Sequence, residues 1–204
     1  MSLIKEDIAD FLTIVNEELY KFEEAIDYTS LSKACALILD AEEKNCRVHI
    51  TGIGKPGHVS AYAASLFSSI GVPTYFLDGT EAIHGSSGQV VEGDIVIAIS
   101  NSGETHELLQ TIECLLDNGA KIISLTGNMN SPLAKRSQIS LTASADNEGD
   151  SLNKPPRASI LVEILTLQML SILLQNEKQL TAEQYVKWHP GGKIGNSILG
   201  GSGS

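Results

Sequence analysis

The pattern of apolar positions divides the chain into two parts near residue 47. Before that point apolar residues recur at three- and four-residue steps over residues 4–28, and a second run, for which Ser30 is the expected cap, continues to about Asn45. These spacings predict two amphipathic helices. The first helix needs a surface to pack on, in its own domain or in a neighbouring subunit. Its apolar stripe consists of Ile4, Ile8, Phe11, Leu12, Val15, Leu19, Phe22 and Ile26.

From Arg47 onward, short apolar runs alternate with glycine-rich turns and helical patterns. Because the runs are apolar on both faces, they are typical of a parallel sheet that helices cover on each side. The fold class predicted is therefore α/β: a doubly wound α-β-α sandwich with a central five-stranded parallel sheet, preceded by the N-terminal helices. The expected strands are residues 48–51, 74–77, 94–100, 121–126 and 139–142.

The last quarter of the chain predicts a loop and two helices. Residues 145–157 are polar, contain two prolines and have no period, which indicates a long loop. Ser159 then opens a strongly apolar helix that runs to about Leu174, and Thr181 caps a short helix ending at Trp188. We expect residues 1–199 to form a single domain that includes the N-terminal helices within 1–45, with 200–204 as a flexible tail.

Composition narrows the class of protein. The 204 residues, 42% of them hydrophobic, suffice for one sizeable core. With 14 Lys and Arg against 25 Asp and Glu and no basic cluster, the chain is poorly suited to nucleic acids or anionic membranes. It shows no signal-peptide pattern, and we expect its apolar runs to be too short to cross a bilayer. The three cysteines are scattered. We therefore expect a cytoplasmic enzyme or sugar-binding protein.

The most informative segment is the turn from Ser100 to Thr105, which follows an apolar strand and opens a helix. It directs free backbone N–H groups and the hydroxyls of Ser100, Ser102 and Thr105 toward one point, with Asn101 beside them. Such a turn can serve only as a helix cap, but three hydroxyls exceed what a cap needs. The turn therefore predicts a phosphate-binding site.

A second strand-to-helix turn contains Gly54 and Lys55. The spacing Gly52, Gly54, Gly57 resembles a dinucleotide fingerprint, but Pro56 and the lack of an acidic residue at the end of a following strand make that interpretation poor. A lysine in this position is either solvated or placed to contact a phosphate or an oxyanion.

Two histidines and two glutamates are further candidates. His84 lies just past a strand and His189 lies in a Trp-His-Pro-Gly-Gly segment, and an imidazole can move protons at neutral pH. Glu107 falls in the first turn of the helix after the phosphate turn, and Glu148 in the long polar loop. Each is also compatible with a structural or solvated role. No spacing typical of a metal site or a catalytic triad is found.

Four segments together resemble one family. Residues 52–58 (GIGKPGH), 81–85 (EAIHG), 97–105 (IAISNSGET) and 189–195 (HPGGKIG) are similar to the motifs of a sugar isomerase (SIS) domain. More narrowly, they resemble the arabinose 5-phosphate isomerase branch. The order and spacing of four motifs make the resemblance far more specific than any single motif, and it extends from the N-terminal helices to Gly195.

The resemblance implies an aldose-ketose isomerase that interconverts ribulose 5-phosphate and arabinose 5-phosphate through a cis-enediolate, without a cofactor or metal. It also implies a homotetramer with sites shared between subunits. Phosphate binding falls on Gly54 and the 100–105 turn. The implied roles are base for Glu148, second acid/base or hydroxyl anchor for Glu107, ring opening for His189 or His84, and stabilisation of the enediolate oxygen for Lys55.

Several positions depart from the family pattern. Pro56 stands where a serine is usual, Ser86 where an aspartate is common, and 156–159 replaces a stretch rich in Thr and Ser while adding Arg157. The paired CBS domains that often follow are absent, so regulation through them is not expected. Two alternatives stay open: another sugar-phosphate isomerase such as 6-phospho-3-hexuloisomerase, and a non-catalytic sugar-phosphate-binding regulatory module. The latter would be expected to carry a helix-turn-helix and a basic face, which the sequence lacks.

Overall fold

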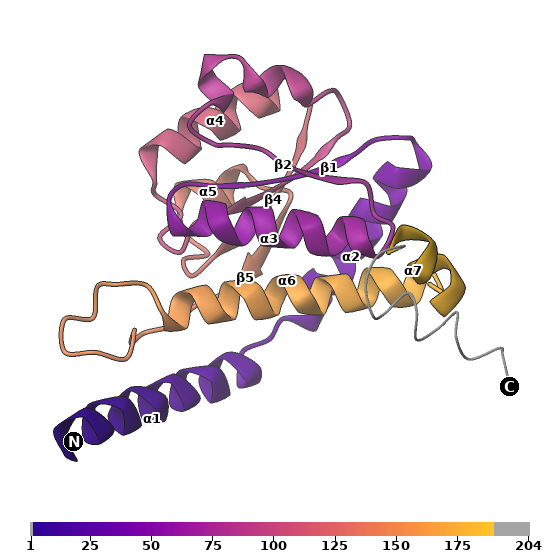
Figure 1. Ribbon diagram of the computed structural model, residues 1–204. Coiled ribbons are helices and arrows are strands. Elements are labelled where there is room, and N and C mark those ends of the chain that lie inside the picture. Colours follow the sequence, from indigo (N-terminus) through magenta and orange to yellow (C-terminus); the bar gives the residue numbers. More distant parts are fainter. Residues whose placement is uncertain (1, 190–204) are drawn as a thin grey trace, which may run out of the picture.

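The computed structural model describes residues 2–189, so the tail expected at 200–204 lies outside the described residues. Helices and strands alternate along most of the chain (Figure 1). The N-terminal helices are α1 (Ser2–Glu24) and α2 (Tyr28–Glu43). The sheet region contains β1 (Val48–Gly52), α3 (Lys55–Ser69), β2 (Thr74–Phe76), β3 (Ile95–Ile99), α4 (His106–Asp117), β4 (Lys121–Thr126), α5 (Pro132–Arg136) and β5 (Ile139–Thr142). It is followed by α6 (Ala158–Glu177) and α7 (Ala182–Trp188).

All five strands form one parallel sheet in the order β2-β1-β3-β4-β5, which confirms the predicted sheet. The chain first adds β2 on one side of β1, and then adds β3, β4 and β5 in turn on the other side of β1. The order therefore reverses between β1 and β3, and the loops after these two strands diverge there. In doubly wound folds this switch point at the carboxyl ends of the strands is where ligands bind.

Both faces of the sheet are covered by helices, as the apolar runs predicted. Alternate residues of β3 point to opposite sides. Ile97 packs in the core formed with α2, α3 and α6, whereas Val96 and Ala98 pack in the core formed with α4 and α5. Figure 1 shows α3 and α6 side by side below the sheet and α4 above it. The doubly wound sandwich is thus confirmed.

Short elements refine the predicted boundaries. Asp27, rather than the expected Ser30, caps α2, because its side chain accepts hydrogen bonds from the N–H groups of Thr29 and Ser30. Thr181 does cap α7, in a capping box with Gln184. The sequence pattern missed α5 and the 3-10 helices at Ala82–His84 and Ser86–Gln89, because these segments are too short to show a period.

Helix α6 corrects one expectation. By length and composition it is apolar enough to cross a membrane, with a mean hydropathy of 1.7 over its most apolar window. Half of that window is buried inside the protein, and the core helix of a soluble protein passes the same test. Its buried face, with Val162, Leu167, Leu170 and Leu174, packs against the sheet and α3.

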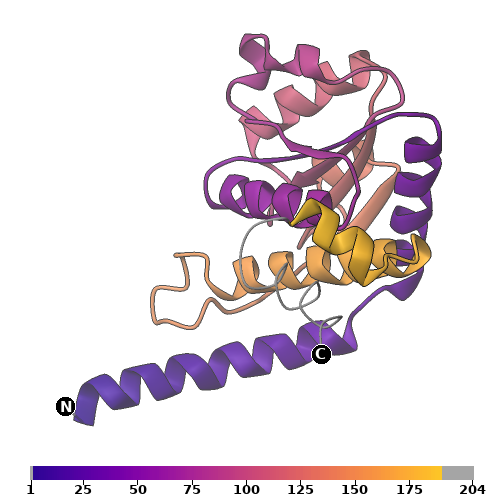
Figure 2. The ribbon, with the colours of Figure 1, turned by 45° about the vertical axis from the view of Figure 1, so that its right-hand side comes forward.

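The apolar stripe of α1 is only partly covered. Val15 and Phe22 are buried against the body of the protein, whereas Ile4, Ile8 and Leu12 are 65%, 55% and 51% exposed. Figure 2 shows why: α1 extends past α6, and its N-terminal end projects beyond the rest of the fold. A helix that leaves three of the eight residues of its apolar stripe more than 50% exposed lacks part of its packing partner.

We predict that the protein is an oligomer in solution and that the exposed half of α1 contributes to the interface. Leu12→Asp should place a charge in that interface and shift the protein to a smaller species, measured by light scattering. Thr13→Asp adds the same charge at the adjacent exposed polar position and should leave the assembly unchanged. A monomeric wild-type protein would contradict the prediction.

Candidate active site

The turn after β1 is built by glycines. A Cβ on Gly57 would lie 2.8 Å from the carbonyl oxygen of Gly52, and one on Gly52 would lie 2.9 Å from the carbonyl carbon of Pro56. The strand and the first turn of α3 therefore touch backbone to backbone. Gly54, at the N-cap, has φ +67°, a left-handed conformation that glycine adopts without strain. Only glycines permit so close an approach of strand, turn and helix.

Lys55 is the first residue of α3 and is exposed. The first N–H groups of a helix have no partner within the helix, and the helix dipole makes this end positive. The charge of Lys55 adds to that positive potential at this edge of the sheet. Pro56 stands within the first turn, where a proline ring suits the helix and the missing N–H costs no hydrogen bond. The replacement of serine by proline is therefore compatible with the turn.

The hydroxyls of the turn after β3 do not cap the helix that follows it. Thr105 occupies the N-cap of α4, yet its side chain makes no capping hydrogen bond. Its Oγ1 instead lies 3.1 Å from Oγ of the buried Ser100, which also accepts a hydrogen bond from the N–H of Gly103. Ser102 Oγ accepts from the N–H of Glu104, while Asn101 and Ser102 are exposed. The beginning of α4 is thus left without a side-chain cap.

Gly103 fixes this turn against the neighbouring helix. Its φ is +64°, and a Cβ there would lie 2.2 Å from Oγ of Ser131, the residue that caps α5. Its carbonyl accepts a hydrogen bond of 3.1 Å from the N–H of Leu133. The phosphate turn is therefore held in one conformation by α5, an element that the sequence pattern did not reveal.

The sheet register brings the two turns together. Gly52 on β1 is paired with Ile99 on β3, so Gly54 and Lys55 leave the sheet beside Ser100. On the other side of β3, the carbonyl of Asn101 accepts hydrogen bonds from the N–H of Gly127 and the hydroxyl of Thr126. The predicted lysine and phosphate turns are therefore neighbours at the switch point.

Glu148 is anchored at the beginning of α6. It is 9% exposed, and its Oε2 accepts hydrogen bonds from the N–H of Arg157 at 2.6 Å and of Ser159 at 3.1 Å. Its own N–H donates to Oδ1 of Asn153 across the loop. Both backbone donors bond the same oxygen, so the carboxylate is held in one orientation while Oε1 makes neither of these bonds.

Helix α1 secures the loop that contains Glu148. Glu18, 3% exposed, accepts a hydrogen bond of 2.7 Å from the N–H of Asp146. Burial raises the pKa of Glu18, but bonds from Lys21 and the loop N–H groups outweigh burial, and the pKa is lowered overall. Gly149 packs against the ring of Phe11, where a Cβ would come within 2.5 Å of the ring. The position of Glu148 therefore depends on α1.

Glu107, His84 and His189 are the remaining predicted residues. Glu107 is exposed in the first turn of α4, directly after the phosphate turn. His84 is exposed at the end of a 3-10 helix beyond β2. His189 follows α7, with its Nδ1 2.8 Å from the carbonyl oxygen of Tyr185 and its ring stacked on the Tyr185 ring at 4.0 Å. Within residues 2–189, no hydrogen bond or ion pair joins either histidine to Lys55, Glu148 or the phosphate turn.

One acidic residue was missed at the level of sequence. Glu163 lies on the apolar helix α6, is 1% exposed, and burial together with the charge of Glu148 raises its pKa to about 8. Its Oε2 has no hydrogen-bond partner among the described residues. A lone glutamate among Val162, Ile164 and Leu165 was the available signal, because a helix this apolar is expected to be buried.

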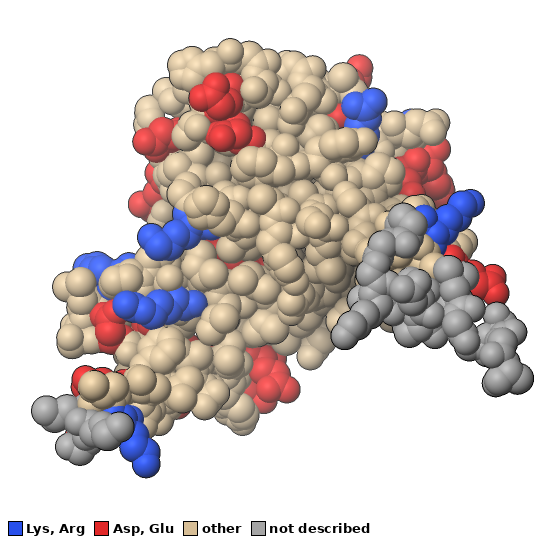
Figure 3. Space-filling model, viewed as in Figure 1, with Lys and Arg blue, Asp and Glu red and all other residues tan. Residues whose placement is uncertain are grey.

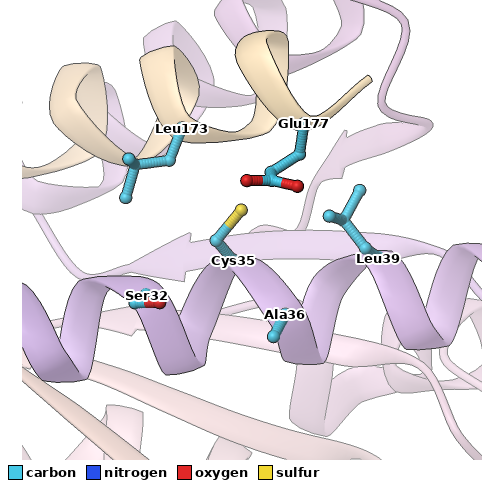
Figure 4. A pocket seen from close by; sticks show the side chains of 6 residues that line it. All are labelled: Ser32, Cys35, Ala36, Leu39, Leu173 and Glu177. Atoms are coloured by element: carbon cyan, nitrogen blue, oxygen red, sulfur yellow. The ribbon is translucent and has the colours of Figure 1, made fainter. Parts of the chain in front are cut away.

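A separate hollow of about 230 Å³ lies between α2 and α6 (Figure 4). It is lined by Ser32, Cys35, Ala36, Leu39, Leu173 and Glu177. Burial, with a smaller effect of Glu177, raises the pKa of the Cys35 thiol, which keeps it protonated and unreactive at neutral pH. The hollow lies away from the carboxyl ends of the strands and contains none of the predicted site residues.

The fold is an α/β domain with two adjacent strand-to-helix turns at its switch point, and comparison with known proteins identifies its family. The SIS domain family model matches residues 42–173, so the chain belongs to the SIS domain family.

Relatives within the family are similar over most of the chain. The arabinose 5-phosphate isomerase KdsD of Pseudomonas aeruginosa is 38% identical over 82% of this chain and 50% of its own length. A structure of Escherichia coli CFT073 c3406 in complex with arabinose 5-phosphate is 33% identical with a TM-score of 0.77, covering 93% of this chain and 96% of that one. The structure of a candidate sugar-phosphate isomerase from Listeria monocytogenes is 27% identical with a TM-score of 0.87, and the match covers 94% of this chain and 98% of that one. The chain spans about half the length of the curated relatives it matches.

We predict that Gly103→Ala distorts the phosphate turn. The new methyl group would clash with Ser131 and force alanine into a left-handed conformation, at a cost of about 1–3 kcal/mol in stability. Affinity for inorganic phosphate should fall at least tenfold, as measured by calorimetric titration. Gly88→Ala is the matched control, because a Cβ there meets nothing within 4 Å. Equal phosphate affinity in both variants would contradict the assigned turn.

A second prediction concerns the buried Glu163. Its folded pKa of about 8 lies above the unfolded value of 4.5, so folding favours its protonated form. Its contribution to stability is therefore full below pH 4.5 and is lost as pH rises to 8. Glu163→Gln cannot ionise, so above pH 8 it should be more stable than wild type by on the order of 4 kcal/mol. Urea denaturation at pH 5 and pH 8.5 measures this difference, and an equal effect at both pH values would refute it.

Proposed function

We propose that this protein is a phosphosugar aldose-ketose isomerase that interconverts ribulose 5-phosphate and arabinose 5-phosphate through a cis-enediolate. The observation that supports the proposal is that the β1–β3 register places two strand-to-helix turns side by side at the carboxyl edge of the sheet. One is the 100–105 turn, which leaves α4 without a side-chain cap, and the other contains Lys55. Glu148, an oriented carboxylate, lies in the loop that follows β5.

The phosphate of the substrate binds at the 100–105 turn. The N–H groups at the beginning of α4 and the hydroxyls of Ser100, Ser102 and Thr105, with the Asn101 amide, supply the hydrogen bonds. Lys55 adds a positive charge from the adjacent turn. In Figure 3, Lys and Arg side chains also lie along the side of the molecule where α3 begins and where the loop before α6 lies. This local positive charge suits an anionic ligand, although the net charge of the chain is −11.

The isomerisation requires removal of a proton from the carbon next to a carbonyl and its return to the neighbouring carbon. Glu148 is the base in this proposal, because two backbone N–H groups fix its Oε2 and leave Oε1 to accept the proton. The protonated carboxyl then returns the proton to the other carbon of the enediolate. Lys55 stabilises the negative enediolate oxygen that forms in between.

Ring opening falls to His84 or His189, and Glu107 is a second acid/base or an anchor for a sugar hydroxyl. Among residues 2–189, no hydrogen bond or ion pair joins His84 or His189 to Lys55, Glu148 or the 100–105 turn. A homotetramer in which a neighbouring subunit contributes a histidine would complete the site. The exposed half of α1 is a surface for such an assembly, and the same helix holds the Glu148 loop.

The choice of substrate is supported by the relatives. The Pseudomonas aeruginosa protein is an arabinose 5-phosphate isomerase, and the c3406 structure is a complex with arabinose 5-phosphate. Arg157 contributes a guanidinium in a region where the family pattern has hydroxyls, and it is ion-paired with Asp150. This difference lies beside Glu148, where it would affect which sugar fits more than which reaction occurs.

The test is a coupled assay with arabinose 5-phosphate and a panel of other pentose and hexose phosphates. Wild type should turn over arabinose 5-phosphate, whereas Glu148→Gln should bind it within a few-fold of wild type and lose about 10²- to 10⁴-fold in kcat. Glu23→Gln makes the same chemical change on the exposed surface of α1 and should retain full activity.

Each outcome of the assay is decisive. If only a hexose phosphate is turned over, the proposed substrate is wrong but the proposed reaction type, aldose-ketose isomerisation, stands. Tight binding of sugar phosphates without any turnover would overturn the isomerase and indicate a binding module. A Glu148→Gln variant with wild-type kcat would remove Glu148 as the base.

A further inference from the structure

We propose that Glu163 is a positioning residue for Glu148: the two carboxyl groups form a pair that holds one proton, carried by Glu163, so that the pair has a single negative charge on Glu148. This inference rests on the proposed function, in which Glu148 is the base. It assigns a role to a buried acid that the sequence motifs leave out.

The first support is the geometry of α6. Glu148 bonds the N–H of Ser159 in the first turn of the helix, and Glu163 follows Ser159 by one turn on the same helix face. Side chains on a helix lean toward its N-terminus, so the Glu163 carboxyl is directed toward the end that Glu148 occupies. The two acids thus lie at one end of one helix, although they are separated by a loop in sequence.

The second support is an unsatisfied polar cluster. Glu163 Oε2 and Ser159 Oγ are both buried, and neither has a hydrogen-bond partner among residues 2–189. Ser159 and Glu163 are each 1% exposed, so neither side chain is in contact with bulk water. An ionised carboxylate in such a place would be costly, whereas a neutral carboxyl needs far less compensation.

The third support is the charge that acts on Glu163. Helices α1, α2 and α3 pack against α6. Among the described residues, however, the charge that shifts the pKa of Glu163 comes from Glu148 in the loop before α6. Burial first and this like charge second raise the pKa of Glu163 to about 8. Burial and the nearby like charge therefore both favour the protonated form of Glu163.

The pair has a consequence for the reaction. With Glu163 neutral, Glu148 removes the substrate proton while Glu163 adds no negative charge to its surroundings. If Glu163 ionises, a second buried charge lies near the anionic enediolate and the phosphate, and raises the free energy of the intermediate. Activity should therefore fall as pH rises through the titration of the pair.

The first experiment is the pH dependence of kcat for wild type, Glu163→Gln and Thr166→Val. Wild type should lose activity about tenfold per pH unit above the titration near pH 8. Glu163→Gln should keep kcat within about threefold at pH 7 but lose this alkaline decline. Thr166→Val alters a buried hydroxyl on the same helix that bonds the carbonyl of Val162, and its pH profile should match wild type. An alkaline decline that persists in Glu163→Gln would overturn the proposal.

A second experiment needs no turnover and no change at Glu163. The pH dependence of urea stability is compared between wild type and Glu148→Gln, which removes the like charge. In Glu148→Gln the like charge is gone, so the pH at which the stability loss caused by Glu163 is complete should be lower than in wild type. An unchanged midpoint would refute the pair. If the pH midpoint is shifted in Glu148→Gln but the wild-type protein has no isomerase activity, the Glu148–Glu163 pair stands and the proposed function is wrong.

Discussion

The in-register pairing of β1 with β3 is the constraint on which the rest of the site depends. It aligns Gly52 with Ile99, so two strand-to-helix turns leave the sheet side by side at the point where the connections reverse direction. The β1 turn presents Lys55 and the β3 turn presents Ser100 and the uncapped beginning of α4. A shift of register by one residue would turn Ile97 out of its core, so burial of the strands fixes the site as well as the fold.

A second constraint fixes the position of the loop that contains Glu148. The Glu148 loop has no helix or strand of its own, yet it is tied at both ends: Glu18 on α1 bonds its backbone, and Glu148 bonds the first N–H groups of α6. The long N-terminal helix thus secures this loop, while Ile4, Ile8 and Leu12 on the same helix stay exposed. A site assembled this way links proton transfer to helix packing, and in the proposed enzyme it links both to assembly.

Much of this arrangement could be predicted from the sequence, because strongly apolar strands and glycine-rich turns can be recognised from local sequence patterns alone. The strands at 121–126 and 139–142 match the structure at both ends, and the turn at 100–105 stands where the motif indicated. What could not be predicted depends on contacts distant in sequence. The support of Gly103 by Ser131, and the proximity of Glu163 to Glu148, arise only when the chain folds. The spatial relation of His84 and His189 to the cluster stays a prediction about the assembly.

The most direct test of the central claim is a crystal structure with arabinose 5-phosphate bound. The account predicts that the phosphate accepts hydrogen bonds from the hydroxyls and N–H groups of residues 100–105, with Lys55 at the reacting end of the sugar. It also predicts that Oε1 of Glu148, from the same or a neighbouring subunit, lies within about 3.5 Å of the carbon that loses the proton. A phosphate bound elsewhere, with the 100–105 turn unoccupied, would contradict it.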